Sequence, residues 1–515
     1  MTQGAVAAGH ARTAEAAASI LQAGGNAFDA ALAALCAACV AEPVLASLGG
    51  GGFLLARAAG AEPWLYDFFV QTPRRRRPTE EVDFRPIVAD FGDAQQEFHI
   101  GLGAAATPGA VKGLFRIHRD LGRLPLSLIL EPARQLALEG VAVNPLQHYI
   151  ATIVEPILRA TPPAFALHAS PTNPEKLAGP GERVAMPDFA ACLDALAAEG
   201  EDLFYRGELA AVLTRDCHEQ GGWLTRDDLT AYQVEKRRPL GLDYRDARIY
   251  TNPAPSLGGM LIGFALELMR QTRPPPRDRL GQLRWLARAM ALTQHMRNES
   301  ELHRHLHDDE RLRELLADWE LRCRELLREH PGATRGTTQI SILDGEGNLA
   351  SMTLSNGEGC GYVLPGSGIM INNMLGEEDL NPGGFHVWPT DRRIASMMAP
   401  SALYMGDGSL VATGSGGSNR IRSAILQVMS NLIDHGMAVD EAVEAPRVHF
   451  EAGLLNLEPP VPAEAPEALG DEFPKQRLWQ GRNLFFGGAH TVRLHPDGRL
   501  EGLGDPRRGG VFLRV

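Results

Sequence analysis

Residues 337–354 read TTQISILDGEGNLASMTL, and apolar and polar side chains alternate on both sides of a central DGEG. Alternation with a period of two is typical of β-strands, and glycines beside acidic residues are typical of the tight turn between two strands. The stretch therefore predicts a β-hairpin that turns at residues 344–347.

A threonine opens this hairpin, directly after Gly336. A threonine hydroxyl is a weak nucleophile, and one way to activate it is to free its own α-amine, which then takes the proton. Thr337 gains a free amine only if the Gly336–Thr337 peptide bond is cut, and a glycine gives little steric hindrance to that attack. On this motif alone, an ordinary strand that starts with β-branched residues is the simpler interpretation.

A glycine-rich turn follows in the C-terminal part, where residues 413–421 read TGSGGSNRI. We expect a strand over 410–413 before it and a helix over 422–436 after it. Glycines at such a position let successive backbone N–H groups point at an anion near a helix N-terminus. The turn is therefore either an oxyanion hole or phosphate site, or a plain connection between a strand and a helix.

The N-terminal part predicts two helices within residues 13–41, with Thr13 capping the first and Asn26 or Asp29 opening the second. Four glycines at 49–52 then lead into an apolar strand. They are either a phosphate cradle or a place where backbones pack closely. We favour close packing, because the chain has neither of the usual glycine-rich phosphate-binding motifs. Residues 280–330 are charged and predict a solvated helix.

Composition limits the classes of function. The chain has 515 residues, 50 basic and 63 acidic side chains and a net charge of −13, which argues against a nucleic-acid partner. Among six cysteines only Cys36 and Cys39 lie close together, in an apolar helical stretch, and we interpret them as core thiols rather than a redox or metal site. The arginine run at 74–77 is interpreted as a solvated or ion-paired loop.

Neither a secretory signal nor a membrane span is visible, so we expect a soluble cytoplasmic protein without a membrane partner.

Many short motifs in a fixed order give the chain a resemblance to a known family. They include AAGHARTAEAAASILQAGGNAFD at 7–29, Glu42-Pro43 with the glycine run, TPGAV at 107–111, LPL at 124–126, FYRG at 204–207, GGWLT at 221–225, PSLGG at 255–259, Gly336-Thr337-Thr338, Asn372-Asn373, SMMAP at 396–400 and the turn at 414–421. In this order the sequence resembles the γ-glutamyltranspeptidase family of N-terminal-nucleophile hydrolases. Each motif alone is weak, but a dozen in order over almost the whole chain are specific.

The resemblance implies an α+β fold, an αββα four-layer sandwich, made as one precursor. The precursor would cut itself between Gly336 and Thr337, so that residues 1–336 form a large segment and 337–515 a small one, and the two stay associated. Thr337 would then attack an amide carbonyl and form an acyl-enzyme. Ser355 would support the nucleophile, and the amides of Gly416 and Gly417 would hold the oxyanion.

No metal or organic cofactor is implied, because the threonine amine serves as the base. The implied partner is a small-molecule amide. The sequence leaves open whether the protein forms a homo-oligomer and whether it catalyses hydrolysis or acyl transfer.

Several positions depart from the family pattern for binding a γ-glutamyl group. Phe69 stands near the place of a carboxylate-binding arginine, and a phenyl ring cannot pair with a carboxylate. Other substrate-binding positions hold Gly357, Met374, Glu377, Ser396 and Met397, with Asn356 as a substitute for a lost amide; Gln339 takes the third place of a Thr-Thr-His pattern.

Removing one partner of a buried charge costs about 3 to 5 kcal/mol. The sequence therefore predicts a self-processing threonine amidohydrolase or acyltransferase whose substrate is an amide other than glutathione. Two alternatives stay open: an unprocessed, non-catalytic relative that binds a small molecule or partner, and a genuine γ-glutamyltransferase.

Overall fold

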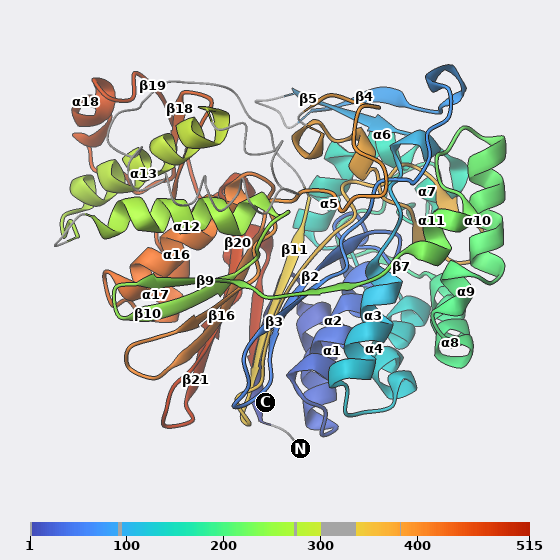
Figure 1. The fold of residues 1–515 in the computed structure, drawn as a ribbon, viewed down its shortest axis with the longest axis horizontal. Coiled ribbons are helices and arrows are strands. Elements are labelled where there is room, and N and C mark those ends of the chain that lie inside the picture. Colours follow the sequence, from blue (N-terminus) through green and yellow to red (C-terminus); the bar gives the residue numbers. More distant parts are fainter. Residues whose placement is uncertain (1–2, 91–94, 272–274, 300–335, 382) are drawn as a thin grey trace.

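The computed structural model describes residues 3–90, 95–271, 275–299, 336–381 and 383–515. Two antiparallel β-sheets lie face to face in the middle of the molecule, and helices cover the outer face of each (Figure 1). This is the αββα sandwich that the resemblance implied.

The first sheet has seven strands in the order β22-β1-β11-β12-β2-β3-β8. In chain order these are β1 (Gly4–Ala8), β2 (Gly51–Arg57), β3 (Trp64–Asp67), β8 (Glu235–Arg237), β11 (Thr338–Asp344), β12 (Leu349–Ser355) and β22 (Val511–Arg514). The predicted hairpin is confirmed, because β11 and β12 pair in antiparallel register from Thr338 opposite Leu354 to Leu343 opposite Leu349.

The second sheet has six strands in the order β21-β20-β16-β15-β10-β9. They are β9 (Leu240–Tyr244), β10 (Ala247–Thr251), β15 (Ser401–Tyr404), β16 (Leu410–Gly416), β20 (Gly488–Leu494) and β21 (Leu500–Leu503). β16 and β20 pack against β11 of the first sheet, so the predicted nucleophile strand lies at the centre of the sandwich.

Two groups of helices form the outer layers (Figure 1). The first sheet is covered by α1 (Ala11–Gln22), α2 (Ala27–Ala41) and α3 (Ala110–Leu121), with α4 (Leu126–Glu139) packed on α2; the second is covered by α12 (Leu257–Arg270), α16 (Arg420–Ile433) and α17 (Val439–Glu444). The expected helix over 422–436 is thus confirmed as α16, which starts two residues earlier.

Smaller elements surround these layers. The helices are α5 (Pro145–Ile153), α6 (Glu155–Leu158), α7 (Pro162–Ala166), α8 (Pro187–Glu199), α9 (Asp202–Tyr205), α10 (Glu208–Glu219), α11 (Arg226–Ala231), α13 (Arg279–Glu299) and α18 (Ala465–Gly470); the strands are β4 (Arg85–Asp90), β5 (Gln95–Ile100), β6 (Val141–Ala142), β7 (Arg183–Val184), β13 (Val363–Leu364), β14 (Ile369–Met370), β17 (Val448–Glu451), β18 (Leu454–Leu457) and β19 (Lys475–Leu478). The helix predicted over 280–330 is present as α13 up to Glu299, but it is not solvated there: Leu283, Ala287 and Met290 are buried, and α13 packs against α12 and β17. Residues 300–330 lie outside the described residues.

The glycine run at 49–52 is a close backbone contact, as expected. A Cβ atom on Gly49 would lie 2.3 Å from the Met370 carbonyl oxygen, and one on Gly52 would lie 2.3 Å from that of Thr353. Side chains do not fit at such distances, so glycine lets β2 approach its neighbours.

The first helix pair differs from the prediction in one cap. His10, not Thr13, caps α1, because its ring Nδ1 accepts a hydrogen bond from the Arg12 backbone N–H. The Thr13 hydroxyl instead donates to Glu42 at 2.9 Å. Asn26 opens α2 as predicted, in a capping box with Asp29.

Cys36 and Cys39 are buried free thiols inside α2, and burial raises the pKa of Cys36 to about 12. Both cysteines are therefore core thiols, as the sequence predicted. The arginine run at 74–77 lies in a loop with ion pairs such as Arg77–Glu81 at 3.0 Å.

No helix in the described ranges is both long and apolar enough to cross a lipid bilayer. Within the same ranges no three histidine, cysteine or acidic side chains gather in a way that could hold a metal ion.

Candidate active site

Thr337 lies just before β11, where the ends of three central strands meet. It is only 5% exposed. The Thr337 hydroxyl donates to the Gly336 carbonyl oxygen at 2.7 Å. The hydroxyl therefore lies against the carbonyl group that it would have to attack in self-cleavage.

Ser355, the last residue of β12, contacts the same carbonyl group. Its hydroxyl donates to the Gly336 oxygen at 3.0 Å and accepts from the Gly357 backbone N–H at 3.1 Å. A donor on a carbonyl oxygen stabilises the negative charge that develops there when a nucleophile adds to the carbon. Ser355 thus has the position that the resemblance implied for a supporting hydroxyl.

Two further contacts fix the ends of this peptide. The Gly336 N–H donates to the Glu358 carboxylate at 3.0 Å. On the other side, a Cβ atom on Gly416 would lie 2.0 Å from the Thr337 carbonyl oxygen. The end of β16 therefore packs directly on Thr337, which requires glycine at position 416.

The turn between β16 and α16 has an unusual backbone. Gly417 has a φ of 119°, and Ser418 has a φ of 51°, which is uncommon for a residue with a side chain. The Ser418 hydroxyl donates to Asp379 at 3.2 Å. Positive φ values outside glycine cost energy and cluster at functional sites, so this turn is a preorganised part of the site.

A buried arginine lies behind the turn. Arg508 is 8% exposed, and its guanidinium is 3.1 Å from the place where a Gly417 Cβ would be. Among the described residues no carboxylate lies within salt-bridge distance of it, and its one hydrogen bond is to the Leu484 carbonyl at 3.4 Å. Burial lowers the pKa of Arg508 to about 10, with Arg420 as a second cause.

Beneath the predicted nucleophile, Thr338 anchors the strand to a buried carboxylate. Its hydroxyl donates to Glu42 at 2.7 Å, and Thr13 donates to the other oxygen. Burial raises the pKa of the Glu42 carboxyl, while these two hydroxyl bonds lower it. Glu42-Pro43, one of the motifs behind the resemblance, thus holds the start of β11.

A pocket of about 370 Å³, open at one end, lies over Thr337. The structure brings many of the predicted site residues into its wall: Phe69, Gly336, Thr337, Ser355, Met374, Glu377, Ser396 and Met397. These residues come from segments far apart in the sequence, so the fold gathers positions that the resemblance to the family had implied. Their individual roles stay predictions.

The wall also contains residues that the sequence analysis missed: Asp379, Leu380, Met398, Ser418 and Ile421. Ser418 and Ile421 lie inside the glycine-rich turn and Met398 inside the SMMAP motif, so these motifs already contained them, although no role was assigned to them. Asp379 and Leu380 had no signal beyond their closeness to Glu377.

Four predicted residues do not line the pocket. Gly416 and Gly417 lie behind Thr337, as described above. Asn356 is buried, 1% exposed, and packs against Gly50 instead of facing the pocket. Gly357 has a φ of 63°, and a Cβ there would lie 2.2 Å from the Glu377 carboxylate, so that carboxylate occupies the space a larger side chain would need.

The described wall is apolar and acidic. It combines Phe69, three methionines, Leu380 and Ile421 with the carboxylates of Glu377 and Asp379, and it contains no lysine, arginine or histidine. The buried Arg393 lies behind Phe69, where it donates to the Phe69 carbonyl oxygen and pairs with Asp67 at 3.2 Å. That cation is not on the pocket wall.

A four-layer αββα sandwich with its site at the start of a central strand defines the class of N-terminal-nucleophile hydrolases. The chain belongs to the gamma-glutamyltranspeptidase family, whose model matches residues 13–515. It is therefore an enzyme of the hydrolase and acyltransferase kind.

Relatives of two kinds match over the whole chain. An "Acylase ACY 1 proenzyme" from Pseudomonas sp. (strain SE83) is 30% identical, with 100% of this chain and 94% of the relative covered. A "Glutathione hydrolase proenzyme" from Escherichia coli (strain K12) is 29% identical, with 98% of this chain and 90% of the relative covered. Among solved structures, cephalosporin acylase from Bacillus halodurans is similar with a TM-score of 0.82 and 26% identity, covering 99% of this chain and 96% of that one.

Proposed function

We propose that the chain is a self-processing amidohydrolase or acyltransferase whose nucleophile is Thr337, and that its substrate is an amide other than a γ-glutamyl compound. The observation that carries the first part is the contact of the Thr337 and Ser355 hydroxyls with one carbonyl oxygen, that of Gly336.

Self-cleavage begins when the Thr337 Oγ adds to the Gly336 carbonyl carbon. The oxygen of that group becomes negative while Ser355 donates to it. The C–N bond then breaks, the nitrogen takes a proton, and an ester joins Gly336 to the Thr337 oxygen. Water hydrolyses the ester and leaves the Gly336 carboxylate, a free Thr337 hydroxyl and a free Thr337 amine.

The freed amine is the base for the second reaction. It accepts the proton of the Thr337 hydroxyl as that oxygen attacks the amide carbonyl of a substrate. The substrate nitrogen leaves with a proton, the acyl group stays on Thr337, and water or an amine removes it. The relatives named as proenzymes support a chain that acts after such processing.

The two segments are expected to stay associated, because their strands alternate. In the first sheet β1 lies between β22 and β11, and β2 lies between β12 and β3. Strands from 1–336 and from 337–515 are therefore neighbours at several places in one hydrogen-bonded sheet.

The charge of the pocket supports the substrate class. A γ-glutamyl group carries an ammonium group and a carboxylate; the described wall offers carboxylates that suit the ammonium group, but no lysine, arginine or histidine for the carboxylate. The carboxylate of such a substrate would be desolvated without a cation on the described wall, which is unfavourable. A neutral or amine-bearing acyl group with an apolar part suits this wall, and the relatives named as acylases point the same way.

A panel of anilides tests this proposal. Mature enzyme should hydrolyse anilides of neutral, medium-length acids at least about tenfold faster, in kcat/KM, than γ-glutamyl anilide, because the carboxylate lacks a partner. Rapid turnover of γ-glutamyl anilide would instead support a genuine γ-glutamyltransferase. Thr337→Ala should abolish cleavage and activity, Thr337→Ser should retain some of each, and the remote Thr152→Ala serves as the control.

A further inference from the structure

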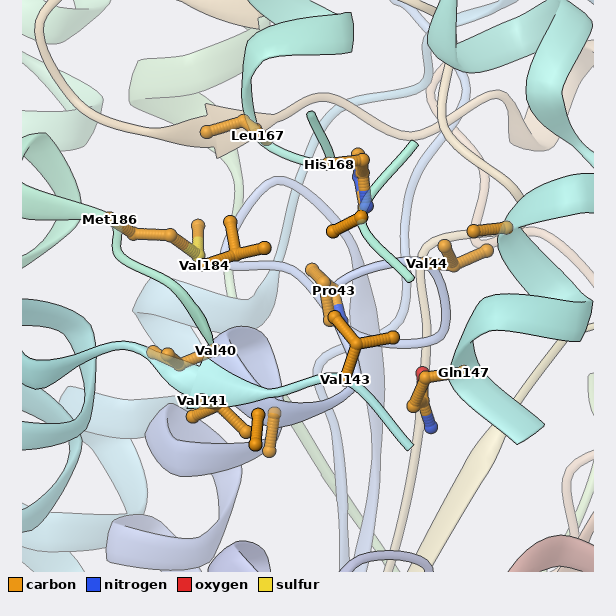
Figure 2. A pocket seen from close by; sticks show the side chains of 14 residues that line it. Val40, Pro43, Val44, Val141, Val143, Gln147, Leu167, His168, Val184 and Met186 are labelled. Carbon is orange, nitrogen blue, oxygen red and sulfur yellow. The ribbon is translucent and has the colours of Figure 1, made fainter. Parts of the chain in front are cut away.

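A second pocket lies on the other side of the turn that carries Glu42. We call it the valine pocket, because its wall includes Val40, Val44, Val141, Val143 and Val184. The remaining lining residues are Ala41, Pro43, Ala142, Gln147, Ala151, Leu167, His168, Ala178 and Met186 (Figure 2). The space that this wall encloses is about 520 Å³, with the open solvent at its mouth included.

Two polar side chains stand out in this apolar wall. Gln147 and His168 are each 8% exposed, and neither side chain has a hydrogen-bonding partner among the residues that the structure describes. In Figure 2 the His168 ring extends toward the space between Pro43 and Val44. The polar atoms of both side chains stay open to the pocket, so a ligand that enters it can supply their hydrogen-bonding partners.

The pocket favours a neutral ligand. No lining residue is acidic or basic apart from the histidine, and burial lowers the pKa of His168 to about 4. At neutral pH the ring therefore offers one N–H donor and one nitrogen acceptor, and Gln147 offers an amide with both functions. An ionised ligand would lose its hydration without gaining a countercharge.

We propose that the valine pocket is a second ligand site and that it binds a neutral aliphatic carboxamide, with the alkyl chain against the valines and the amide group on His168 and Gln147. A carboxamide has both donor and acceptor atoms, so it can satisfy both side chains, whereas an alkane satisfies neither.

The site is distinct from the pocket over Thr337, although the two flank one turn. Ala41, Pro43 and Val44 line the valine pocket. Glu42 between them does not, and its carboxylate accepts hydrogen bonds from Thr13 and Thr338 instead. The proposal does not depend on which amide is cleaved at Thr337.

The test is titration of the Thr337→Ala protein, which cannot hydrolyse an amide, with hexanamide, hexanoate and hexylamine at pH 7.5, followed by calorimetry. With Met397→Phe added to fill the pocket over Thr337, hexanamide should still bind saturably, and both charged probes should bind about tenfold more weakly or not at all. Equal binding of hexanoate, or no saturable binding of hexanamide up to its solubility, would overturn the proposal.

Variants locate the binding. Ala151→Phe fills the valine pocket and should weaken hexanamide binding by about tenfold or more, and His168→Phe should weaken it by roughly fivefold or more through the lost hydrogen bond. Met397→Phe fills the pocket over Thr337 and should leave this binding unchanged. Loss of binding in Met397→Phe with retention in Ala151→Phe would place the ligand over Thr337 and refute the proposal. If Ala151→Phe does not fold, His168→Phe and the charged probes decide.

Discussion

At the residue scale, one peptide group carries the proposed chemistry. The Gly336 carbonyl oxygen accepts from Thr337 and Ser355, and the Gly336 N–H, which belongs to the preceding peptide group, donates to Glu358. A residue held at both its N–H and its carbonyl group loses little further freedom when attack begins, and such positioning is a large part of catalysis.

Ser355 is the first residue to change. Ser355→Ala removes a donor from the oxygen that becomes negative, so self-cleavage should slow by roughly 100-fold. Ser355→Thr keeps a hydroxyl and should retain most of the rate. The rate is read from the loss of the intact chain on denaturing gels, with the exposed Ser19→Ala as control. Unchanged cleavage in Ser355→Ala would remove this role from Ser355.

Arg508 is the second residue to change. Its guanidinium, which has no carboxylate partner among the described residues, lies close to Gly416, against which the Thr337 carbonyl packs. A nearby positive charge stabilises an oxyanion and lowers the pKa of an amine. Arg508→Met should therefore lower kcat/KM by about tenfold and move the acidic limb of the pH profile of kcat/KM to higher pH. Arg508→Lys should restore part of the rate and part of the pH profile. If Arg508 had only a structural role, Arg508→Met would lower stability but leave the pH profile of kcat/KM unshifted, and that result would contradict the electrostatic role.

The sequence predicted the site unevenly at this scale. Phe69, Met374, Glu377 and Met397 could be located, because they stand at fixed offsets from recognisable motifs. Arg508 could not, because its significance comes from three glycines, Gly416, Gly417 and Gly488, that make room for its side chain from other parts of the chain.

At the element scale, the glycine run of β2 positions Ser355. A Cβ on Gly50 would lie 2.4 Å from the Ser355 carbonyl oxygen. The close contact between the two backbones therefore sets where the end of β12 lies.

Gly50→Ala should shift Ser355 and destabilise the fold by roughly 1 to 3 kcal/mol, because the added methyl group meets backbone rather than a flexible side chain. Gly470→Ala is the matched control: its Cβ meets nothing within 4 Å, and it lies in α18. The control should be neutral or slightly stabilising. Urea unfolding measures both, and equal stability of the two variants would contradict the packing argument.

The hairpin shows what an alternating pattern can and cannot tell. The alternation over 337–354 predicted β11 and β12 correctly. The polar face does not meet water, however: Gln339 donates to Ser341 and Ser351, and Ser341 donates to the His490 carbonyl in the facing sheet. Period-two alternation is the same for a strand facing solvent and one facing a hydrogen-bonded layer.

At the scale of the whole molecule, several histidines are buried in their neutral form. Burial lowers the pKa of His10, His168 and His490 to about 4. His10 and His490 each accept a backbone N–H on Nδ1, which also requires the neutral ring.

Stability should therefore depend on pH in a defined window. The unfolded chain binds these protons below about pH 6.5 and the folded chain only below about 4, so the free energy of unfolding should fall as pH drops through this range, by up to about 3 kcal/mol per histidine. His168→Phe should reduce the slope, and the exposed His218→Gln should not. A melting temperature that stays constant from pH 6.5 to 4 would contradict the assignment.

The overall architecture could be inferred because many motifs kept their order along the chain, not because any single pattern specified four layers. The valine pocket had no sequence signal, since its valines and alanines come from separate elements and look like ordinary core residues.

The most direct test is N-terminal sequencing of purified, active enzyme. The proposal predicts two polypeptides, the second of which begins Thr-Thr-Gln-Ile-Ser at residue 337. Active protein that yields only the original N-terminus, with the Gly336–Thr337 bond unbroken, would contradict the assignment of Thr337 as the nucleophile.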